Sequence, residues 1–179
     1  MALPVFKYHP DPIATNCIVE ADVECRCCAQ RRGFIYTGPV FAEEDLADSI
    51  CPWCIADGSA HERFNAEFTD SAGITSDSGE PVPPAVVEEV SYRTPGFTGW
   101  QQEHWVACCG DAAAFLGRAG CKELKSKWAA AVPALRDEAG LSAEEWNDFA
   151  NDLDAEESPT AYVFRCLHCD MLLGYTDCD

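Results

Sequence analysis

The chain has 179 residues, with 31 acidic and 12 basic side chains and a formal net charge of −19. This length fits one compact domain or two small ones, and a hydrophobic share of 47% is sufficient for a folded core. The charge argues against nucleic acid as a partner, because phosphate backbones are bound mainly by Lys and Arg.

The first part of the chain is organised around two Cys-x-x-Cys pairs. The segment between the pairs is rich in aromatic and β-branched residues, which predicts a strand. In order, the predicted elements are extended chain over 1–24, a strand over 33–41 broken by a Gly-Pro turn, a short acidic helix over 42–48, and a helix over 55–64 that Gly58 weakens. Each Cys-x-x-Cys pair would form a short turn, or knuckle. The order of knuckle, β-rich connector, knuckle and helix is typical of a treble-clef or zinc-ribbon module.

The second part begins after a segment rich in Ser, Gly, Asp and Pro at residues 69–84, which we interpret as a surface loop or linker. Helices are predicted over 84–90, over 112–116, over about 122–138 with a break near Pro133, and from Ser142 onward. The last residues, 162–175, predict a strand, a third Cys-x-x-Cys knuckle and another strand.

The helix that begins at Ser142 carries the clearest local signals. Ser142 followed three residues later by Glu145 fits a capping box. Trp146, Phe149 and Leu153 would form one apolar stripe at helical spacing.

The N-terminus gives no sign of export. It lacks a basic region followed by an apolar run, so it is not expected to be a signal peptide. No stretch approaches the length needed to cross a bilayer, so no membrane insertion is expected. We therefore expect a cytoplasmic protein, whose thiols stay reduced and whose 12 cysteines indicate metal or redox chemistry rather than a disulfide framework.

A first metal site is predicted from Cys25, Cys28, Cys51 and Cys54. A Cys-x-x-Cys knuckle holds two sulfurs on one short turn, and two such knuckles supply the four thiolates of a closed tetrahedral zinc site. Cys27 lies inside the first knuckle and is an alternative ligand, but the spacing favours Cys28.

A second metal site is predicted around the C-terminal knuckle, Cys166 and Cys169, which needs two further ligands. The nearest unclaimed thiols are the adjacent Cys108 and Cys109, and these complete the predicted set. His104 and Asp111 remain open as alternative ligands from the same region. The competing interpretation is a protein with one zinc ion and a C-terminal pair that binds no metal.

Two enzyme interpretations compete with structural zinc. The pair Cys51 and Cys54 resembles a thiol-oxidoreductase motif, but that motif belongs in a βαβ pattern that this segment lacks. A catalytic zinc ion keeps an open coordination position, which four thiolates do not leave. Cys17, Cys121 and Cys178 have no partners at ligand spacing and are interpreted as core or incidental residues.

The chain also resembles a known family, the bacterial CbrC family, which is named for colicin E2 tolerance. The resemblance runs over nearly the whole length and is carried by residues 6–12, the Cys25 to Cys28 knuckle, 36–39, 51–60, 93–97, 100–103, Trp105, 109–112 and 164–169. The family often has His where Cys108 stands here, and a His/Cys exchange suits a zinc ligand. The resemblance implies a role in colicin tolerance or envelope stress, and it implies no catalytic residue.

Taken together, the sequence predicts an α+β fold with zinc-ribbon or treble-clef-like four-cysteine modules, short strands and several helices. The predicted divisions are an N-terminal knuckle module over 1–68, a loop or linker over 69–84, and a helical region over 85–179 completed by the C-terminal knuckle, all within what could be one compact domain. Two structural zinc ions are expected. The leading function is a non-enzymatic interaction or tolerance factor whose acidic surface binds a basic protein, and the alternative is a metal-dependent or thiol-redox enzyme.

Overall fold

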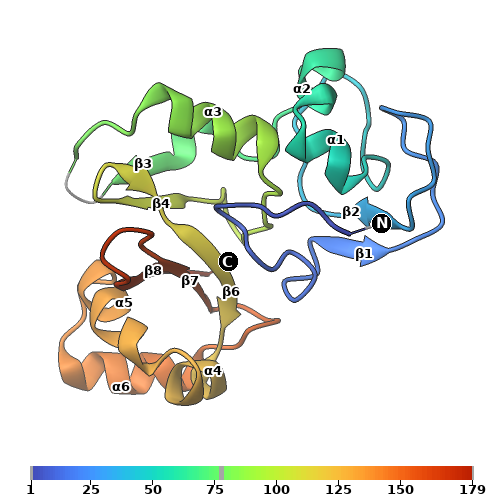
Figure 1. Cartoon of the computed structure of the whole chain (residues 1–179). Coiled ribbons are helices and arrows are strands. Elements are labelled where there is room, and N and C mark those ends of the chain that lie inside the picture. Colours follow the sequence, from blue (N-terminus) through green and yellow to red (C-terminus); the bar gives the residue numbers. More distant parts are fainter. Residues whose placement is uncertain (1, 77–78, 179) are drawn as a thin grey trace.

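The computed structural model describes residues 2–76 and 79–178, and it confirms an α+β fold with two four-cysteine clusters (Figure 1). Within these residues the strands form three small sheets. The first pairs β1 (Ile18–Glu20) antiparallel with β2 (Phe34–Tyr36), the second has the order β3 (Ile74–Ser76), β4 (Trp105–Cys108) and β5 (Asp111–Ala112), and the third has the order β6 (Ala114–Ala119), β7 (Thr160–Arg165) and β8 (Leu172–Asp177).

The helices are short and fall into two groups. Near the first cysteine pairs lie α1 (Pro52–Ala56), α2 (Ser59–Phe64) and α3 (Pro84–Arg93), and the one-turn 3-10 helix η1 (Ser71–Gly73) precedes β3. The second group is α4 (Cys121–Ser126), the 3-10 helix η2 (Ala129–Ala131), α5 (Val132–Glu138) and α6 (Ala143–Asp152), which lie beside the β6–β7–β8 sheet (Figure 1). Of the helices in the described residues, none combines the length and apolar character needed to span a membrane.

Strand β7 separates two hydrophobic cores. Side chains alternate between the faces of a strand, so Tyr162 and Phe164 face one core whereas Ala161 and Val163 face the other. The second, smaller core is covered by α4, α5 and α6, whose buried residues Leu124, Leu135 and Trp146 pack with that face. One strand from the end of the chain therefore contributes to both cores.

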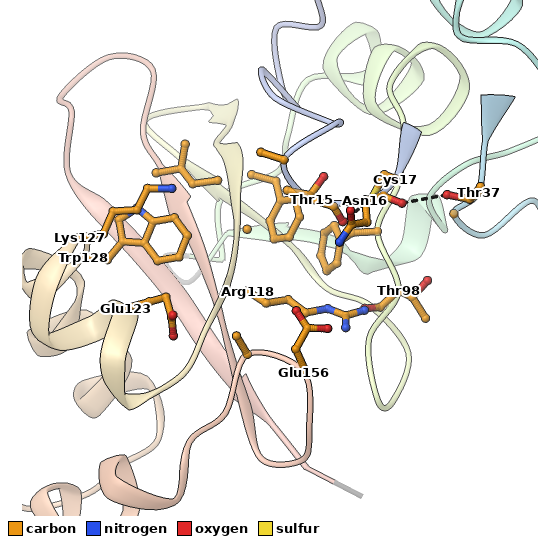
Figure 2. Close-up of a pocket in the computed structure, with 17 residues that line it drawn as sticks. Thr15, Asn16, Cys17, Thr37, Thr98, Arg118, Glu123, Lys127, Trp128 and Glu156 are labelled. Carbon is orange, nitrogen blue, oxygen red and sulfur yellow. Dashed lines mark hydrogen bonds between the residues drawn. The ribbon is translucent and has the colours of Figure 1, made fainter. Parts of the chain in front are cut away.

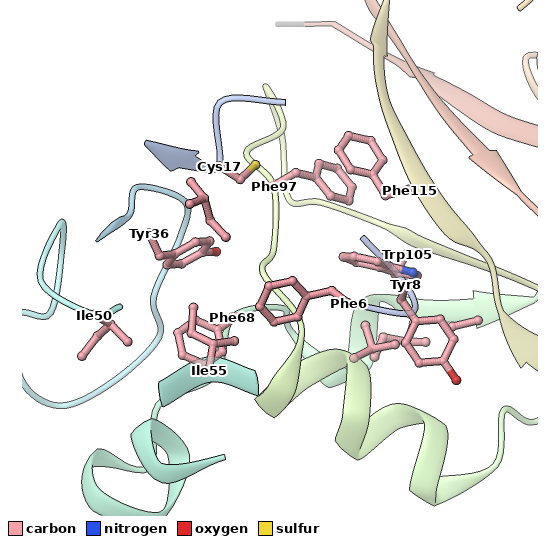
Figure 3. Close-up of a cluster of buried hydrophobic side chains, with 14 of the residues drawn as sticks. Phe6, Tyr8, Cys17, Tyr36, Ile50, Ile55, Phe68, Phe97, Trp105 and Phe115 are labelled. Atoms are coloured by element: carbon pink, nitrogen blue, oxygen red, sulfur yellow. The ribbon is translucent and has the colours of Figure 1, made fainter. Parts of the chain in front are cut away.

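The first core joins the N-terminal part of the chain to the C-terminal sheet. Phe97 lies at its centre, 2% exposed, with its ring centroid 4.0 Å from that of Phe115 and 5.5 Å from that of Trp105 (Figure 3). Its ring centroid also lies 5.5 Å from that of Tyr162 and 5.8 Å from that of Phe164. Phe6, Tyr36 and Phe68, which precede the predicted 69–84 linker, belong to the same core.

Several local predictions are confirmed. The helix beginning after Ser142 has its capping box, in which Ser142 Oγ accepts a hydrogen bond from the Glu145 N–H and the Glu145 carboxylate accepts one from the Ser142 N–H. The strand–knuckle–strand order at the end of the chain is β7, the turn of Cys166, and β8. Helix α3 begins at Pro84, where a proline is tolerated because the first helical N–H groups need no partner in the helix.

Other local predictions are wrong for identifiable reasons. The acidic segment 42–48 is not helical, because contacts with the first knuckle determine its conformation. The Arg26 guanidinium donates to Asp45 O and forms an ion pair with Glu44 at 2.7 Å. Leu46 of this segment is buried. The predicted apolar helix 112–116 is extended instead: Ala112 pairs with β4, and Ala114 and Phe115 pair with β7. Cross-strand pairing prevails over the helix propensity of alanine.

Two further predictions need correction. The helix over 122–138 breaks before Pro133, at Lys127 and Trp128, and Pro133 lies in the first turn of α5. The expected loop 69–84 contains η1 and β3, and β3 pairs in parallel with β4. The part of that loop at residues 77–78 lies outside the described residues.

Candidate metal centres

The first cluster comprises Cys25, Cys28, Cys51 and Cys54, whose sulfur atoms all lie within 4.8 Å of one another. The Sγ–Sγ separation is 3.9 Å between Cys25 and Cys54, 3.8 Å between Cys28 and Cys51, and 3.6 Å between Cys51 and Cys54. Four sulfurs bound about 2.3 Å from one zinc ion would lie about 3.8 Å apart. A disulfide requires about 2.05 Å, so these are free thiols at the spacing of metal ligands.

The two halves of the first cluster come from different local structures. Cys51 is the N-cap residue of α1, and Cys54 follows in its first turn, so the start of the helix directs both sulfurs to one point. Pro52 at the first helical position sets the backbone angle that begins this turn. Cys25 and Cys28 lie on a knuckle between β1 and β2. A hydrogen bond links the two halves, because the Cys51 N–H donates to Cys25 Sγ at 3.2 Å.

The knuckle that holds Cys25 and Cys28 is repeated at Cys166 and Cys169. In the first, the Cys25 N–H donates to Gln30 O at 3.0 Å; in the second, the Cys166 N–H donates to Met171 O at 2.9 Å, again five residues ahead. The residue after each knuckle has a left-handed backbone conformation, with φ of 54° at Ala29 and 56° at Asp170. The same turn therefore presents two sulfurs at two places in the chain.

The second cluster comprises Cys108, Cys109, Cys166 and Cys169, whose sulfurs also lie within 4.8 Å of one another. Cys108 and Cys109 are adjacent, with their sulfurs 3.7 Å apart. This is achieved by a two-residue hairpin between β4 and β5, in which Cys109 and Gly110 both have positive φ, 55° and 73°. Positive φ at both central residues is the type I′ turn that suits the twist of antiparallel strands.

The clusters differ in exposure. In the first cluster Cys25, Cys51 and Cys54 are buried, at 0%, 1% and 2% exposure, and Cys28 is half-buried. In the second cluster only Cys166 is buried, Cys108 is half-buried, and Cys109 and Cys169 are exposed. The first cluster is part of the main core, and the second lies at the surface.

Each cluster contains a thiol that favours the thiolate form, which is the form that binds metal. Hydrogen bonds from the Cys51 and Cys54 thiols lower the pKa of Cys25. The hydrogen bond that Cys51 makes with Cys25 raises the pKa of Cys51 to about 12. In the second cluster burial opposes ionisation, but the N–H groups of Cys169 and His168 outweigh it and lower the pKa of Cys166 to about 6.

The alternative ligands considered from the sequence lie elsewhere. Cys27 directs its sulfur to Ser59 Oγ, 3.5 Å away, and not to the first cluster. His104 shares a hydrogen bond with Thr75 and stacks on Tyr175 with ring centroids 5.4 Å apart.

Asp111 lies next to the second cluster without belonging to it. Its carboxylate accepts hydrogen bonds from Tyr8 Oη at 2.7 Å and Lys7 Nζ at 3.0 Å, and it lies 3.0 Å from His168 Nε2. His168 is inside the Cys166 knuckle, so Asp111 connects that knuckle to the N-terminal segment. The tyrosine, lysine and histidine are 103, 104 and 57 residues from Asp111, and no local sequence signal indicates the network.

His9 is a buried residue outside both clusters. Its Nδ1 lies 2.7 Å from Pro95 O, which only an N–H can bond, so Nδ1 carries the proton and Nε2 accepts from Thr15 Oγ1 at 2.7 Å. Burial lowers the pKa of His9 from 6.5 to about 4. The His9 ring is therefore neutral in the folded protein.

This burial predicts a pH dependence of stability. Between pH 6.5 and about 4 the unfolded chain binds the His9 proton and the folded chain does not, so the free energy of unfolding falls as pH falls through this window. We expect His9 to account for a loss of about 1 kcal/mol between pH 7 and pH 5.5. His9→Asn keeps a donor for Pro95 O but cannot titrate. Urea unfolding at both pH values, with excess zinc, should show a smaller loss for this variant, and equal losses would contradict the prediction.

A cavity of about 380 Å³ lies between the N-terminal segment, β6 and α4. Figure 2 shows Lys127 and Trp128 on one side of it and Cys17 and Thr37 on the other. A bulge in β6 lies at its wall, where Gly117 has a φ of 134°. Of the described residues that line the cavity, none is a clustered cysteine, so an ion at either cluster would not face its interior.

Comparison with known proteins gives relatives over nearly the whole chain. The chain is 52% identical over 178 residues to a UPF0167 protein of Mycobacterium bovis, covering 98% of this chain and 93% of the relative, with the same figures for a UPF0167 protein of Mycobacterium tuberculosis. It is 40% identical over 173 residues to a UPF0167 protein of Pseudomonas aeruginosa, covering 93% and 92%. No solved structure matches. Residues 3–178 match the uncharacterised protein family UPF0167, and the chain belongs to this family.

Proposed function

We propose that this chain is a non-enzymatic protein stabilised by two structural zinc ions, whose acidic surface binds a basic protein. The observation that carries the proposal is that each cluster offers four thiol sulfurs within 4.8 Å of one another. Four thiolates complete the tetrahedral coordination of zinc and leave no position for a water molecule or a substrate. Such sites contribute to folding rather than to catalysis.

The redox alternative has less support from the geometry. The attacking thiol of a Cys-x-x-Cys oxidoreductase must be accessible and readily ionised. Cys51, the first cysteine of that motif, is 1% exposed, and hydrogen bonding with Cys25 raises its pKa to about 12. Both properties are opposite to those of a redox nucleophile.

The acidic surface is concentrated on and after α6. Within residues 144–157 there are seven carboxylates, all exposed, and no Lys or Arg. They are Glu144, Glu145, Asp148, Asp152, Asp154, Glu156 and Glu157. We call this set the α6 acidic surface. Its uniformly negative charge is complementary to that of a basic partner.

Helix stability does not explain this charge. Acidic residues in the first turn, such as Glu144 and Glu145, favour a helix because they face its positive end. Asp152 ends α6 at the negative end, where a carboxylate costs about 0.3–1 kcal/mol. Asp154 has a structural role, because its Oδ1 accepts hydrogen bonds from the N–H groups of Glu156 and Glu157. We assign the other carboxylates beyond the first turn, Asp148, Asp152, Glu156 and Glu157, to binding rather than to folding. The resemblance to the colicin-tolerance family leads us to propose that the basic partner acts in tolerance or envelope stress.

The zinc sites are tested by metal analysis and X-ray absorption at the zinc edge on untagged protein. We expect two zinc ions per chain, each with four sulfur ligands at about 2.3 Å. Oxygen or nitrogen in the coordination shell would indicate an open, catalytic type of site, and iron in place of zinc would refute the metal assignment.

Partner binding is tested by affinity capture at low salt, followed by elution at moderate salt. The test variant carries Asp148→Asn, Asp152→Asn, Glu156→Gln and Glu157→Gln. A control with the same change in charge carries four exposed substitutions elsewhere, namely Glu20→Gln, Glu24→Gln, Glu62→Gln and Glu88→Gln. We expect salt-released proteins to bind the wild type and the control but not the test variant. Equal capture by both variants, or no salt-released protein, would contradict the α6 acidic surface as the binding site.

A further inference from the structure

The second cluster differs from the first in that oxidants can reach its sulfurs. Cys109 and Cys169 are both exposed, whereas Cys25, Cys51 and Cys54 are at most 2% exposed. Oxidation of cysteine depends on access to the sulfur and on its thiolate character. Zinc ligation would supply the thiolate character at both clusters, so exposure is the property that distinguishes them.

The two exposed sulfurs come from separate elements. Cys109 is at the tip of the turn between β4 and β5, and Cys169 ends the knuckle between β7 and β8. Their sulfurs lie within 4.8 Å of each other, as parts of the second cluster. A small movement of the hairpin tip could bring them to bonding distance, since the turn is at the surface and carries no core side chain at Gly110.

We propose that Cys109 and Cys169 form a peroxide-sensitive oxidation site, in which a disulfide between them dismantles the second cluster while the first cluster stays intact. The proposal rests on the proposed second zinc ion. It assigns to this cluster a modification by hydroperoxides that the structural function alone does not require. The chain would then report oxidative conditions through one cluster and keep its fold through the other.

The chemistry balances with hydrogen peroxide as the oxidant. One thiolate attacks a peroxide oxygen, so that an S–O bond forms, the O–O bond breaks, and hydroxide leaves. The second thiolate attacks the resulting sulfenic sulfur, so that the S–S bond forms, the S–O bond breaks, and a second hydroxide leaves. Two electrons pass from the two sulfurs to the peroxide, and two protons from the buffer acid convert the two hydroxides to water.

The local structure explains why the change would be confined to one cluster. The disulfide removes two of the four sulfurs, and the remaining pair of Cys108 and Cys166 is insufficient for a closed zinc site. The strands that carry the knuckle stay paired, because β7 and β8 are held by six residue pairs independent of the metal. The first cluster is packed into the main core, where Cys25, Cys51 and Cys54 are buried and Cys28 is half-buried.

The experiment is performed on the full-length zinc-loaded protein, with zinc counted before any oxidant is added. Hydrogen peroxide is then added in stepwise equivalents in the presence of a colour-forming zinc chelator, and disulfides are mapped by mass spectrometry. We expect one of the two zinc ions to be released, a disulfide between Cys109 and Cys169, and recovery of the second ion after reduction and zinc addition. Release of both ions together, release of none, or a disulfide elsewhere would overturn the proposal.

Matched variants separate this proposal from the structural one. The double variant Cys121→Ser, Cys178→Ser removes thiols outside both clusters, one half-buried and one exposed, and should release one zinc ion as the wild type does. Cys109→Ser should form no disulfide at this site under the same peroxide. A wild type that contains fewer than two zinc ions before oxidation would contradict the proposed function, whereas two ions that both resist peroxide would contradict only the oxidation site.

Discussion

Cys54→Ser is expected to lose the first zinc ion and to unfold the N-terminal part of the chain. Cys54 lies 3.6 Å from Cys51 and 3.9 Å from Cys25, sulfur to sulfur, within the main core. The elements around it are a sheet with strands of three residues and a helix of five, too short to be stable alone. Structural zinc contributes about 10–16 kcal/mol of binding free energy, comparable to the whole stability of a domain.

Cys169→Ser is the matched comparison, because it removes a ligand of the second cluster. We expect it to lose one zinc ion but to retain cooperative unfolding, since Cys169 is exposed and the β7–β8 pairing does not depend on it. Cys27→Ser controls for loss of a buried thiol outside the clusters. Zinc content and amide hydrogen exchange over β1 and β2 measure the effects. Equal damage from both ligand variants would refute the larger contribution of the first cluster to folding, and a Cys54→Ser protein with two zinc ions would refute Cys54 as a zinc ligand.

Phe97→Ala is expected to destabilise the protein by about 3–5 kcal/mol, which is the usual cost of truncating a buried phenylalanine. Phe97 is 2% exposed, and its ring stacks on Phe115 at 4.0 Å. It also contacts aromatic residues of β4 and β7, so the cavity left by alanine would lie between β4, β6 and β7. For a chain of this size each kcal/mol lowers Tm by about 2–4 °C, so a loss of roughly 10 °C is expected.

Phe41→Ala makes the same truncation at a side chain that is 44% exposed, and it should cost little. Urea unfolding monitored by tryptophan fluorescence measures both variants, with zinc content confirmed to be unchanged. A Phe97→Ala protein as stable as Phe41→Ala would contradict the importance of the Phe97 aromatic contacts for the main core.

Sequence patterns were most informative where a short segment determines its own geometry. The capping box at Ser142 depends on contacts three residues apart, and it is present as predicted. The Cys-x-x-Cys spacing likewise specifies a turn that holds two sulfurs, and the structure brings the eight predicted cysteines together in two groups of four. Zinc as the ion that these two groups hold is our proposal.

Patterns failed where distant segments decide the conformation. Ala112, Ala113 and Ala114 favour a helix locally, yet Ala114 begins a strand whose partner, Arg165 in β7, is 51 residues away. The acidic segment 42–48 similarly takes its conformation from contacts with Arg26 on the knuckle, and it forms no helix. Local propensity is worth less than 1 kcal/mol per residue, so pairing and burial prevail over it.

The sequence by itself determined the α+β class, the Cys-x-x-Cys turns and the excess of negative charge. These features depend on composition and on contacts between residues that are only a few positions apart. Only the tertiary structure decided that Cys109 and Cys169 are exposed while Cys25 is buried, that Asp111 joins Tyr8 to the His168 knuckle, and that β7 divides two cores. Exposure and long-range hydrogen bonding depend on which segments pack together. That packing is a property of the whole chain, which minimises its apolar surface and pairs its buried polar groups at once.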